Sequence, residues 1–142
     1  MCTTRLVAVI LVAAATAAGV SSAAPARVQV PRFAVAEDPD WSPDGKKIAF
    51  VASTVPGYTP PRTLYVMNAD GSGVRALTGP GFAADWPSWS PDGRWLVFTS
   101  DRTGNDDIYN GDIYVVNSDG SGERQLTHSQ LDVTSAVWSP VG

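Results

Sequence analysis

Short apolar runs, separated by turn residues, fill the chain after residue 37. Residues 47–51 (K-I-A-F-V) and 95–99 (W-L-V-F-T) are bounded by turns on both sides. This pattern is typical of strands that are covered on both faces. Residues 64–68 and 113–117 form a second pair of such runs, each after a loop of variable length. Because no helical periodicity follows residue 26, the pattern predicts an all-β structure.

Turn motifs separate these runs at fixed places. W-S-P-D-G occurs at 41–45 and 89–93, where proline presets φ for a tight turn and glycine supplies a positive φ. N-x-D-G-S-G at 68–73 and 117–122 contains Asp-Gly, a strong hairpin signal between β-rich runs. Two further strands per repeat complete the set: the run into the tryptophan (85–89 in the second copy), and a shorter, more polar outer strand at 74–78 and 123–127. The sequence pattern therefore predicts four antiparallel strands in each repeat.

The whole pattern is an internal repeat. The tryptophans at 41, 89 and 138 are 48 and 49 residues apart. Four antiparallel strands in each 40–50-residue unit, with a tryptophan at a fixed place, indicate a β-propeller blade. We expect repeat 1 at about 37–84, repeat 2 at about 85–133, and the start of repeat 3 at 134–142. Propellers need roughly four to eight blades to close. Residues 27–142 therefore predict an incomplete propeller of about two complete blades plus the start of a third, and the chain is expected to be a fragment.

Residues 1–26 have the layout of a secretory signal peptide. A short basic start ends at Arg5, a run of thirteen mostly apolar residues covers 6–18, and small residues lead to A-P-A at 24–26. The run is shorter than the roughly 20 residues of a membrane-spanning helix. We expect cleavage after Ala26; an earlier cut and an uncleaved anchor are the alternatives. The prediction is an exported protein, periplasmic or secreted, without stable membrane insertion after cleavage.

Residues 27–36 lead from this segment into the first repeat. Val28 and Val30, then Phe33 and Val35, alternate with polar or small residues, and Pro31 interrupts the pattern. The segment could form a first strand, a strand contributed to another blade, or an extended leader.

Net charge and cysteine content argue against two kinds of chemistry, nucleic-acid binding and thiol chemistry. The net charge of −4 argues against broad binding to nucleic acid, which requires a basic face. The one cysteine, Cys2, lies in the predicted signal peptide, so the mature chain has no thiol and no internal disulfide.

The repeat motifs resemble those of a known protein family. W-S-P-D-G-K-K-I-A-F from Trp41, followed by L-Y-V-M-N-A-D-G-S-G-V-R-A-L-T from Leu64, resembles the WD-like propeller repeat of the TolB-type family. The second copy, with F-T-S-D-R at 98–102 and D-I-Y-V-V-N at 112–117, is closer still. The resemblance covers about residues 37–140 and implies a β-propeller. Such repeats occur in periplasmic TolB, in the propellers of prolyl-oligopeptidase-type peptidases, and in other exported proteins.

Candidate catalytic and metal-binding chemistry is sparse. His128 is the only histidine and follows an outer strand, and no G-x-S-x-G nucleophile elbow is present. The acidic loop at 101–107 invites a calcium interpretation, but it lacks the regular D-x-D-x-D-G spacing and a closing glutamate. Asp70 and Asp119 are explained by turn geometry. We therefore expect no catalytic residue, no metal site and no cofactor.

Residues that differ between the repeats are the better candidates for binding. The repeated positions are interpreted as turn and packing residues: Trp41, Pro43, Asp44, Gly45, Trp89, Pro91, Asp92, Gly93 and Trp138. Trp86 and Trp95 correspond to Asp38 and Lys47 in repeat 1, and non-repeated aromatics suit a binding surface. The extra residue of repeat 2 falls in the loop after its second strand, and loops that vary between repeats often lie on the binding face. The candidate surface is Trp86, Trp95, Asp101, Arg102, Asp106, Asp107 and Tyr109.

Two functions follow from this sequence. The first is an exported, non-enzymatic TolB-like propeller that binds protein partners or an extracytoplasmic ligand. The alternative is the N-terminal propeller part of a prolyl-oligopeptidase-type serine peptidase or other hydrolase whose catalytic domain lies outside this sequence. Self-association is expected for the isolated fragment, because an incomplete propeller exposes apolar blade faces.

Overall fold

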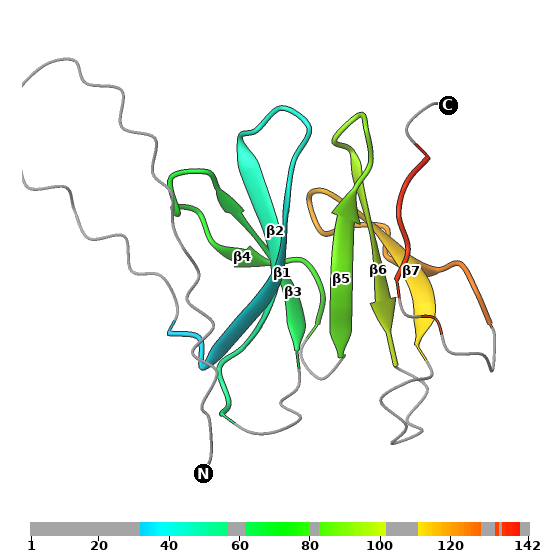
Figure 1. Cartoon of the computed structure of the whole chain (residues 1–142), viewed down its shortest axis with the longest axis horizontal. Coiled ribbons are helices and arrows are strands. Elements are labelled where there is room, and N and C mark those ends of the chain that lie inside the picture. The colour runs from blue at the N-terminus through cyan, green and yellow to red at the C-terminus, as the bar shows by residue number, and fades with distance from the viewer. Residues whose placement is uncertain are drawn as a thin grey trace, which may run out of the picture.

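Two four-stranded antiparallel sheets make up the structured part of the chain. The computed structural model describes residues 32–56, 62–79, 83–101, 111–128, 133 and 135–139, and these form eight strands and no helix (Figure 1). The first sheet contains β1 (Val35–Trp41), β2 (Lys47–Ser53), β3 (Thr63–Asn68) and β4 (Arg75–Ala76). The second contains β5 (Ala84–Trp89), β6 (Trp95–Ser100), β7 (Asp112–Asn117) and β8 (Arg124–Gln125). The predicted signal peptide lies outside the described residues.

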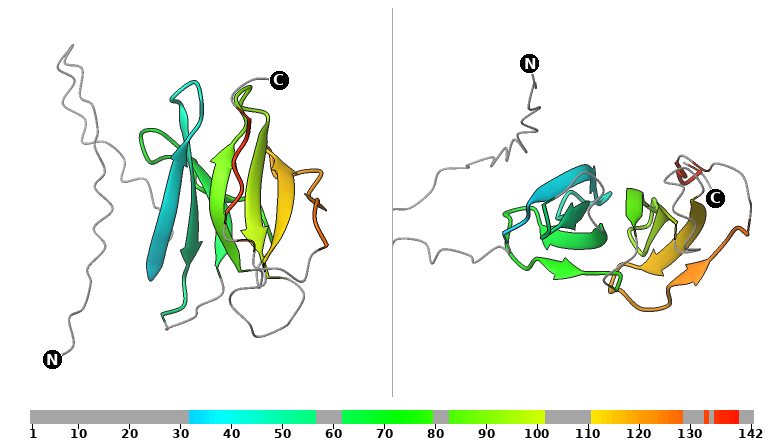
Figure 2. Two further views of the ribbon diagram at one scale, coloured as in Figure 1. Left: turned by 45° about the vertical axis from the view of Figure 1, so that its right-hand side comes forward. Right: turned by 90° about the horizontal axis from the view of Figure 1, so that it is seen from below.

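Each sheet is a simple meander in which neighbours in sequence pair in space. The strand orders are β1-β2-β3-β4 and β5-β6-β7-β8, with every pairing antiparallel. Seen from below, each sheet runs from its first strand at one rim to its short fourth strand at the other (Figure 2, right). This is the arrangement of propeller blades, and it confirms the predicted all-β, four-stranded architecture.

The fourth strands are shorter than the five residues predicted for each. β4 and β8 are two residues long. Threonine explains the difference. The Leu64 N–H donates to Thr78 Oγ1 at 3.1 Å, and the Ile113 N–H donates to Thr127 Oγ1 at 2.9 Å. Each hydroxyl takes the place of a backbone carbonyl, so the ladder ends early without leaving the donor unpaired.

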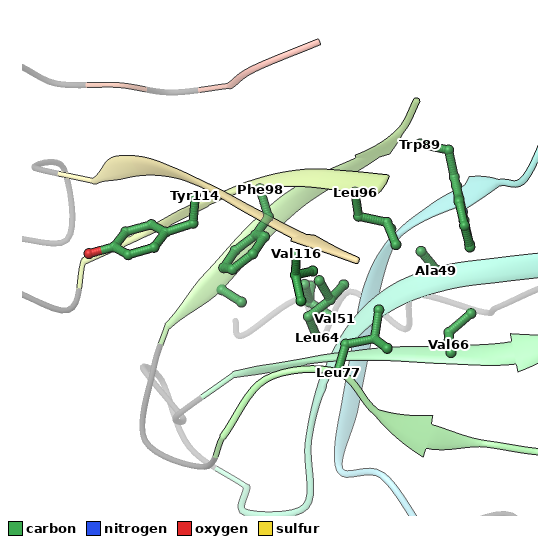
Figure 3. Packing of buried hydrophobic residues seen from close by; sticks show 11 residues of the cluster. Ala49, Val51, Leu64, Val66, Leu77, Trp89, Leu96, Phe98, Tyr114 and Val116 are labelled. Carbon is green, nitrogen blue, oxygen red and sulfur yellow. The ribbon is translucent and has the colours of Figure 1, made fainter. Parts of the chain in front are cut away.

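The core lies between the two sheets. Alternate residues of β2 and β3 face alternate residues of β6 and β7 across the space between the sheets. Figure 3 shows this cluster, with the indole of Trp89 beside Ala49. The buried cluster is Ala49, Val51, Leu64, Val66, Leu77, Ala84, Trp89, Leu96, Phe98, Tyr114 and Val116.

The leader covers part of the other face of the first sheet. Phe50 and Tyr65 stack at 5.7 Å on that face, and the Phe33 ring meets both edge-on, at 5.5 and 4.9 Å. Phe98 and Tyr114 repeat the same stack in the second sheet, where the first sheet covers them. Of the interpretations left open for residues 27–36, the described part shows Ala34 and Val35 extending the β1–β2 ladder; residues 27–31 lie outside the described residues.

Arg75 joins the sheets at their outer rim. From β4, its guanidinium donates to the carbonyls of Ser118 and Asp119, in the turn between β7 and β8, and the bond to Asp119 is 3.0 Å long. Arg124 is the equivalent residue of the second sheet, and it is exposed. Arg75 is therefore a contact between blades.

We expect Arg75→Ala to lower the free energy of unfolding by about 1–2 kcal/mol, because hydrogen bonds from a charged donor are lost at a partly exposed site. Arg124→Ala is the matched control, and we expect it to change stability by less than about 0.5 kcal/mol. Urea denaturation followed by circular dichroism measures both. Equal effects of the two substitutions would show that Arg75 does not hold the sheets together.

Candidate functional site

The first strand of each sheet contains a β-bulge at the same repeat position. The register shifts between Glu37 and Asp40 in β1, and between Asp85 and Ser88 in β5. The first of the two unpaired residues in each bulge has a left-handed backbone: φ is 51° at Asp38 and 47° at Trp86. Such values are uncommon outside glycine and are strained for a bulky residue. Bulges often re-aim a side chain, and here residue Trp86 is 47% exposed.

An arginine pairs with one acidic residue of each first strand. Arg62, immediately before β3, places Nη1 2.7 Å from Asp85 Oδ1 and 3.3 Å from Glu37 Oε2. Glu37 and Asp85 are equivalent residues of the two repeats. One guanidinium thus links the starts of β1 and β5.

Two carboxylates of β1 also receive backbone N–H groups of β5. Asp40 Oδ2 accepts the Trp89 N–H at 2.8 Å, and Asp38 Oδ2 accepts the Trp86 N–H at 3.4 Å. These bonds seat the strained bulge of β5 against β1. The exposed Trp86 is consequently held in position by the neighbouring blade.

The pKa of Asp85 is raised to about 6. Burial is the main cause, and it outweighs the opposing attraction of Arg62. The negative charges of Asp38, Asp101 and Glu37 raise it further. The ion pair with Arg62 and the raised pKa are consistent, because a single cation only partly offsets desolvation and three nearby anions.

The Arg62–Asp85 ion pair contains two unpaired buried polar atoms, Arg62 Nε and Asp85 Oδ1. Among the described residues, the other buried side-chain atoms without a hydrogen-bond partner are Ser100 Oγ and Trp89 Nε1. Asp85 Oδ1 contacts Arg62 as an ion pair without hydrogen-bond alignment. Ser100 is 2% exposed and opposes Ala84 in the ladder, so both face the first sheet. The Ala84 N–H donates to the Arg62 carbonyl at 3.3 Å, which joins the start of β5 to the residue before β3.

The structure divides the predicted binding residues. Trp86 and Asp101 lie at one end of the β5–β6 pair, since Asp85 opposes Thr99 and the charge of Asp101 acts on Asp85. Trp95 begins β6 next to the 90–94 turn, at the other end of that pair. Four predicted residues fall outside the described part of the chain: Arg102, Asp106, Asp107 and Tyr109.

The repeat-structural tryptophans occupy three environments. Trp89 is buried at 6% exposure, whereas Trp41 is 52% exposed. Trp138 Nε1 donates to the Ser88 carbonyl at 3.0 Å. In the turns, Asp44 Oδ1 accepts the Ser42 hydroxyl at 2.7 Å and the Lys46 N–H at 3.1 Å, and Asp92 does the same with Ser90 and Arg94. Gly45 and Gly93 have φ of 68° and 70°.

The one histidine and the possible metal ligands can be located only within the described residues. His128 is exposed and follows β8. No group of three or more His, Cys, Asp or Glu residues could hold a metal ion within the described part of the chain. Within that part there is also no helix of the length and hydrophobicity needed to cross a bilayer.

Sequence reasoning missed Glu37, Arg62, Asp85 and Ser100. Glu37 and Asp85 carried a usable signal, because an acidic residue recurs at the same place of both repeats. Arg62 carried none, since its counterpart in repeat 2 is Gly111 and it follows a loop of variable length.

The fold defines this chain as part of a repeat-built β-propeller. A family model described as the TolB beta propeller domain matches residues 21–142, so the chain belongs to the TolB β-propeller domain family. The match includes the last six residues of the predicted signal peptide. A comparison with curated proteins finds no match.

Solved structures agree with this family. A protein assigned as TolB from Agrobacterium tumefaciens is 35% identical, with a TM-score of 0.51, over 63% of this chain and 29% of that one. TolB from Acinetobacter baumannii is 27% identical, with a TM-score of 0.59, over 75% of this chain and 24% of that one. A puromycin hydrolase is 26% identical, with a TM-score of 0.55, over 68% of this chain and 15% of that one. The chain thus spans under a third of each of these proteins.

Proposed function

We propose that this chain is part of an exported, non-catalytic β-propeller that binds a protein partner. The observation that carries the proposal is Trp86, an aromatic side chain that is 47% exposed although the backbone that holds it is strained and seated on β1. Strained backbone persists only where the surrounding structure imposes it, and it clusters at functional sites. Exposed tryptophans are also frequent anchors of protein interfaces. Export is supported by the signal-peptide pattern of residues 1–26.

The test compares two tryptophans at opposite ends of the same strand pair. The chain is immobilised, and proteins retained from an extracytoplasmic extract are quantified for the original sequence, Trp86→Ala and Trp95→Ala. The proposal expects partners that the original and Trp95→Ala retain and that Trp86→Ala loses. Identical sets from all three proteins would overturn it, as would turnover of peptide substrates by the purified chain.

A second candidate is the propeller part of a hydrolase. It is favoured by the likeness to puromycin hydrolase, which covers 68% of this chain at 26% identity. The gene sequence downstream of the codon for Gly142 distinguishes the two. A G-x-S-x-G motif followed by Asp and His would favour the hydrolase, whereas further W-S-P-D-G copies up to the stop codon would favour the binding propeller.

A further inference from the structure

The chain has two sheet faces that no other sheet among the described residues covers, and they lie on opposite sides of the pair of sheets (Figure 2, right). Residues that oppose each other in a ladder share a face. The face of the first sheet that points away from the second, which we name the leading face, carries Trp41, Ile48, Tyr65 and Met67, with the 69–71 turn beside them. The face of the second sheet that points away from the first, which we name the trailing face, carries Val97, Val115, Arg124 and Leu126.

These two faces repeat the two sides of the junction that already joins the sheets. Leu77 is buried in this junction against Gly120, since a Cβ on Gly120 would lie 3.5 Å from Leu77 Cδ2. The equivalent of Leu77 is Leu126 on the trailing face, which is 45% exposed. The equivalent of Gly120 is Gly71 beside the leading face, where a Cβ would meet no described atom within 4 Å. Each half of this contact thus recurs on a face where its counterpart is missing.

A tryptophan follows the same rule. Trp89 belongs to the buried cluster of the junction, whereas its equivalent on the leading face, Trp41, is 52% exposed. Trp41 opposes Ile48 in its ladder as Trp89 opposes Leu96, so both indoles stand at the same place on their own sheets. Only Trp89 has a neighbouring sheet to cover it.

An arginine gives the third pair of equivalent residues. Arg75 donates to two carbonyls of the 118–119 turn across the junction. Its equivalent on the trailing face is Arg124, which is exposed. The carbonyls equivalent to those of the 118–119 turn belong to the 69–70 turn, beside the leading face. Donor and acceptors of this bond therefore also recur on opposite faces of the chain.

We propose that copies of this chain dock head to tail, with the trailing face of one copy on the leading face of the next, in the geometry of the junction within each chain. Leu126 then packs against Gly71 of the next copy, and Arg124 donates to the carbonyls of its 69–70 turn. Trp41 of that copy becomes buried. Because the two faces differ, the contact is heterologous, and such contacts form a ring if the rotation closes. Roughly four to eight blades close a propeller, which corresponds to about two to four copies.

Two segments of the same chain cover parts of these faces, and an incoming copy has to replace them. Phe33 lies edge-on against the aromatic stack of the leading face. Trp138 has the repeat position of Trp41 and donates from Nε1 to the Ser88 carbonyl at 3.0 Å; residues 135–139, red in Figure 1, run beside the second sheet. The first strand of the next copy would take that place. Removing the Trp138 side chain should therefore strengthen docking, even though it makes the chain less apolar.

The experiment follows the assembly of the whole protein. The full sequence of 142 residues is expressed, and the protein is purified in the form that the cell's own processing leaves. Sedimentation velocity over a range of concentrations should show monomers giving way to discrete assemblies of about two to four copies. A protein that stays monomeric at every concentration, or that forms assemblies without an upper size, would overturn the proposal.

Single substitutions locate the two faces. Leu126→Asp and Trp41→Asp should each weaken assembly about 10-fold or more, as for residues at the centre of an interface. Arg124→Ala should weaken it about 10-fold, because hydrogen bonds from a charged donor are lost. Trp138→Ala should strengthen it about 2-fold or more, because the binding-competent state becomes more populated. Val55→Asp is the matched control: Val55 is 51% exposed and lies beyond the end of β2, so we expect a change of less than about 2-fold.

A mixture of the two aspartate variants distinguishes head-to-tail docking from other kinds of self-association. Leu126→Asp keeps its leading face intact and Trp41→Asp keeps its trailing face, so one junction can form between them. The mixture should give dimers with one copy of each variant, whereas each variant alone stays monomeric. If mixing restores no dimer, or if Val55→Asp weakens assembly as much as Leu126→Asp does, the proposal is wrong.

Circular dichroism shows whether each variant is folded. Arg124→Ala keeps the proposal testable if Trp41→Asp misfolds, since the Arg124 side chain is exposed in the single chain. The proposed function is judged separately, from partner retention by Trp86→Ala. A chain that binds its partners through Trp86 but never assembles would overturn head-to-tail docking and leave the proposed function standing.

Discussion

Replacing Trp89 with alanine should lower the free energy of unfolding by about 3–5 kcal/mol, as for other large buried aromatic side chains. Trp89 is 6% exposed and belongs to the cluster between the two sheets, where it lies beside Ala49 (Figure 3). Truncation leaves a cavity between two rigid sheets that cannot close around it. Because small domains are stable by only about 5–15 kcal/mol, the loss would remove much of the total. Urea denaturation monitored by circular dichroism measures it.

Trp41 provides the matched control, because it occupies the same place in the W-S-P-D-G motif of repeat 1. It is 52% exposed, since no sheet among the described residues covers it. We expect Trp41→Ala to cost less than about 1 kcal/mol. Similar losses from the two substitutions would mean that this tryptophan stabilises its own turn rather than the contact between blades.

The contrast between Trp41 and Trp89 shows what a repeat motif can and cannot specify. The motif fixes where the indole stands on its own sheet, and the preceding sheet decides whether it is buried. The exposed indole also gives the predicted self-association a physical basis, since a second copy could cover it. Sedimentation velocity tests this: a fragment of residues 27–142 that stays monomeric at all concentrations would contradict the prediction.

The strands were predictable because each depends on local pattern. The runs at 47–51 and 95–99 became β2 and β6, which are buried along almost their whole length. The same pattern gave the third strands, which begin one residue earlier than predicted, at Thr63 and Asp112. The fourth strands are shorter than predicted because threonine hydroxyls replaced backbone carbonyls as acceptors in the ladder. This replacement depends on side-chain geometry, which the hydrophobic pattern does not reveal.

The candidate site was only partly predictable because its groups come from both repeats. Trp86 and Asp101 were found from their differences between the repeats. The bulges were not found: alternation in sequence does not reveal a residue with positive φ, and Asp38 and Trp86 differ in size and polarity. Arg62 lies 25 residues from Glu37, and repeat 2 has Gly111 at the equivalent position. Its position depends on the packing of one sheet on the other, since the start of β3 meets that of β5.

Relative to Asp85→Asn, the original chain should lose stability as the pH rises from about 4 to about 6. The folded pKa of about 6 lies above the ordinary value of 3.8, so between these values folded Asp85 keeps a proton that the unfolded chain has released. Stability is then lost as the pH rises through about 6. A shift of about two units corresponds to roughly 3 kcal/mol at most, and we expect about 1–2 because part of the side chain stays in water.

Asparagine isolates this contribution because it keeps the shape of the side chain and cannot ionise. The aspartates of the turns, Asp44, Asp70, Asp92 and Asp119, have lowered pKa values, chiefly because each accepts a serine hydroxyl. They lose stabilisation in acid equally in both proteins, so their effect cancels in the difference.

Unfolding free energies of both proteins between pH 4 and pH 8 therefore give the test. Asp85→Asn should gain on the original chain as the pH rises, and carbon-13 NMR of the Asp85 carboxyl should show its midpoint near pH 6. Parallel stability curves would mean that Asp85 titrates normally. If the original chain instead gains on Asp85→Asn with rising pH, the attraction of Arg62 outweighs burial.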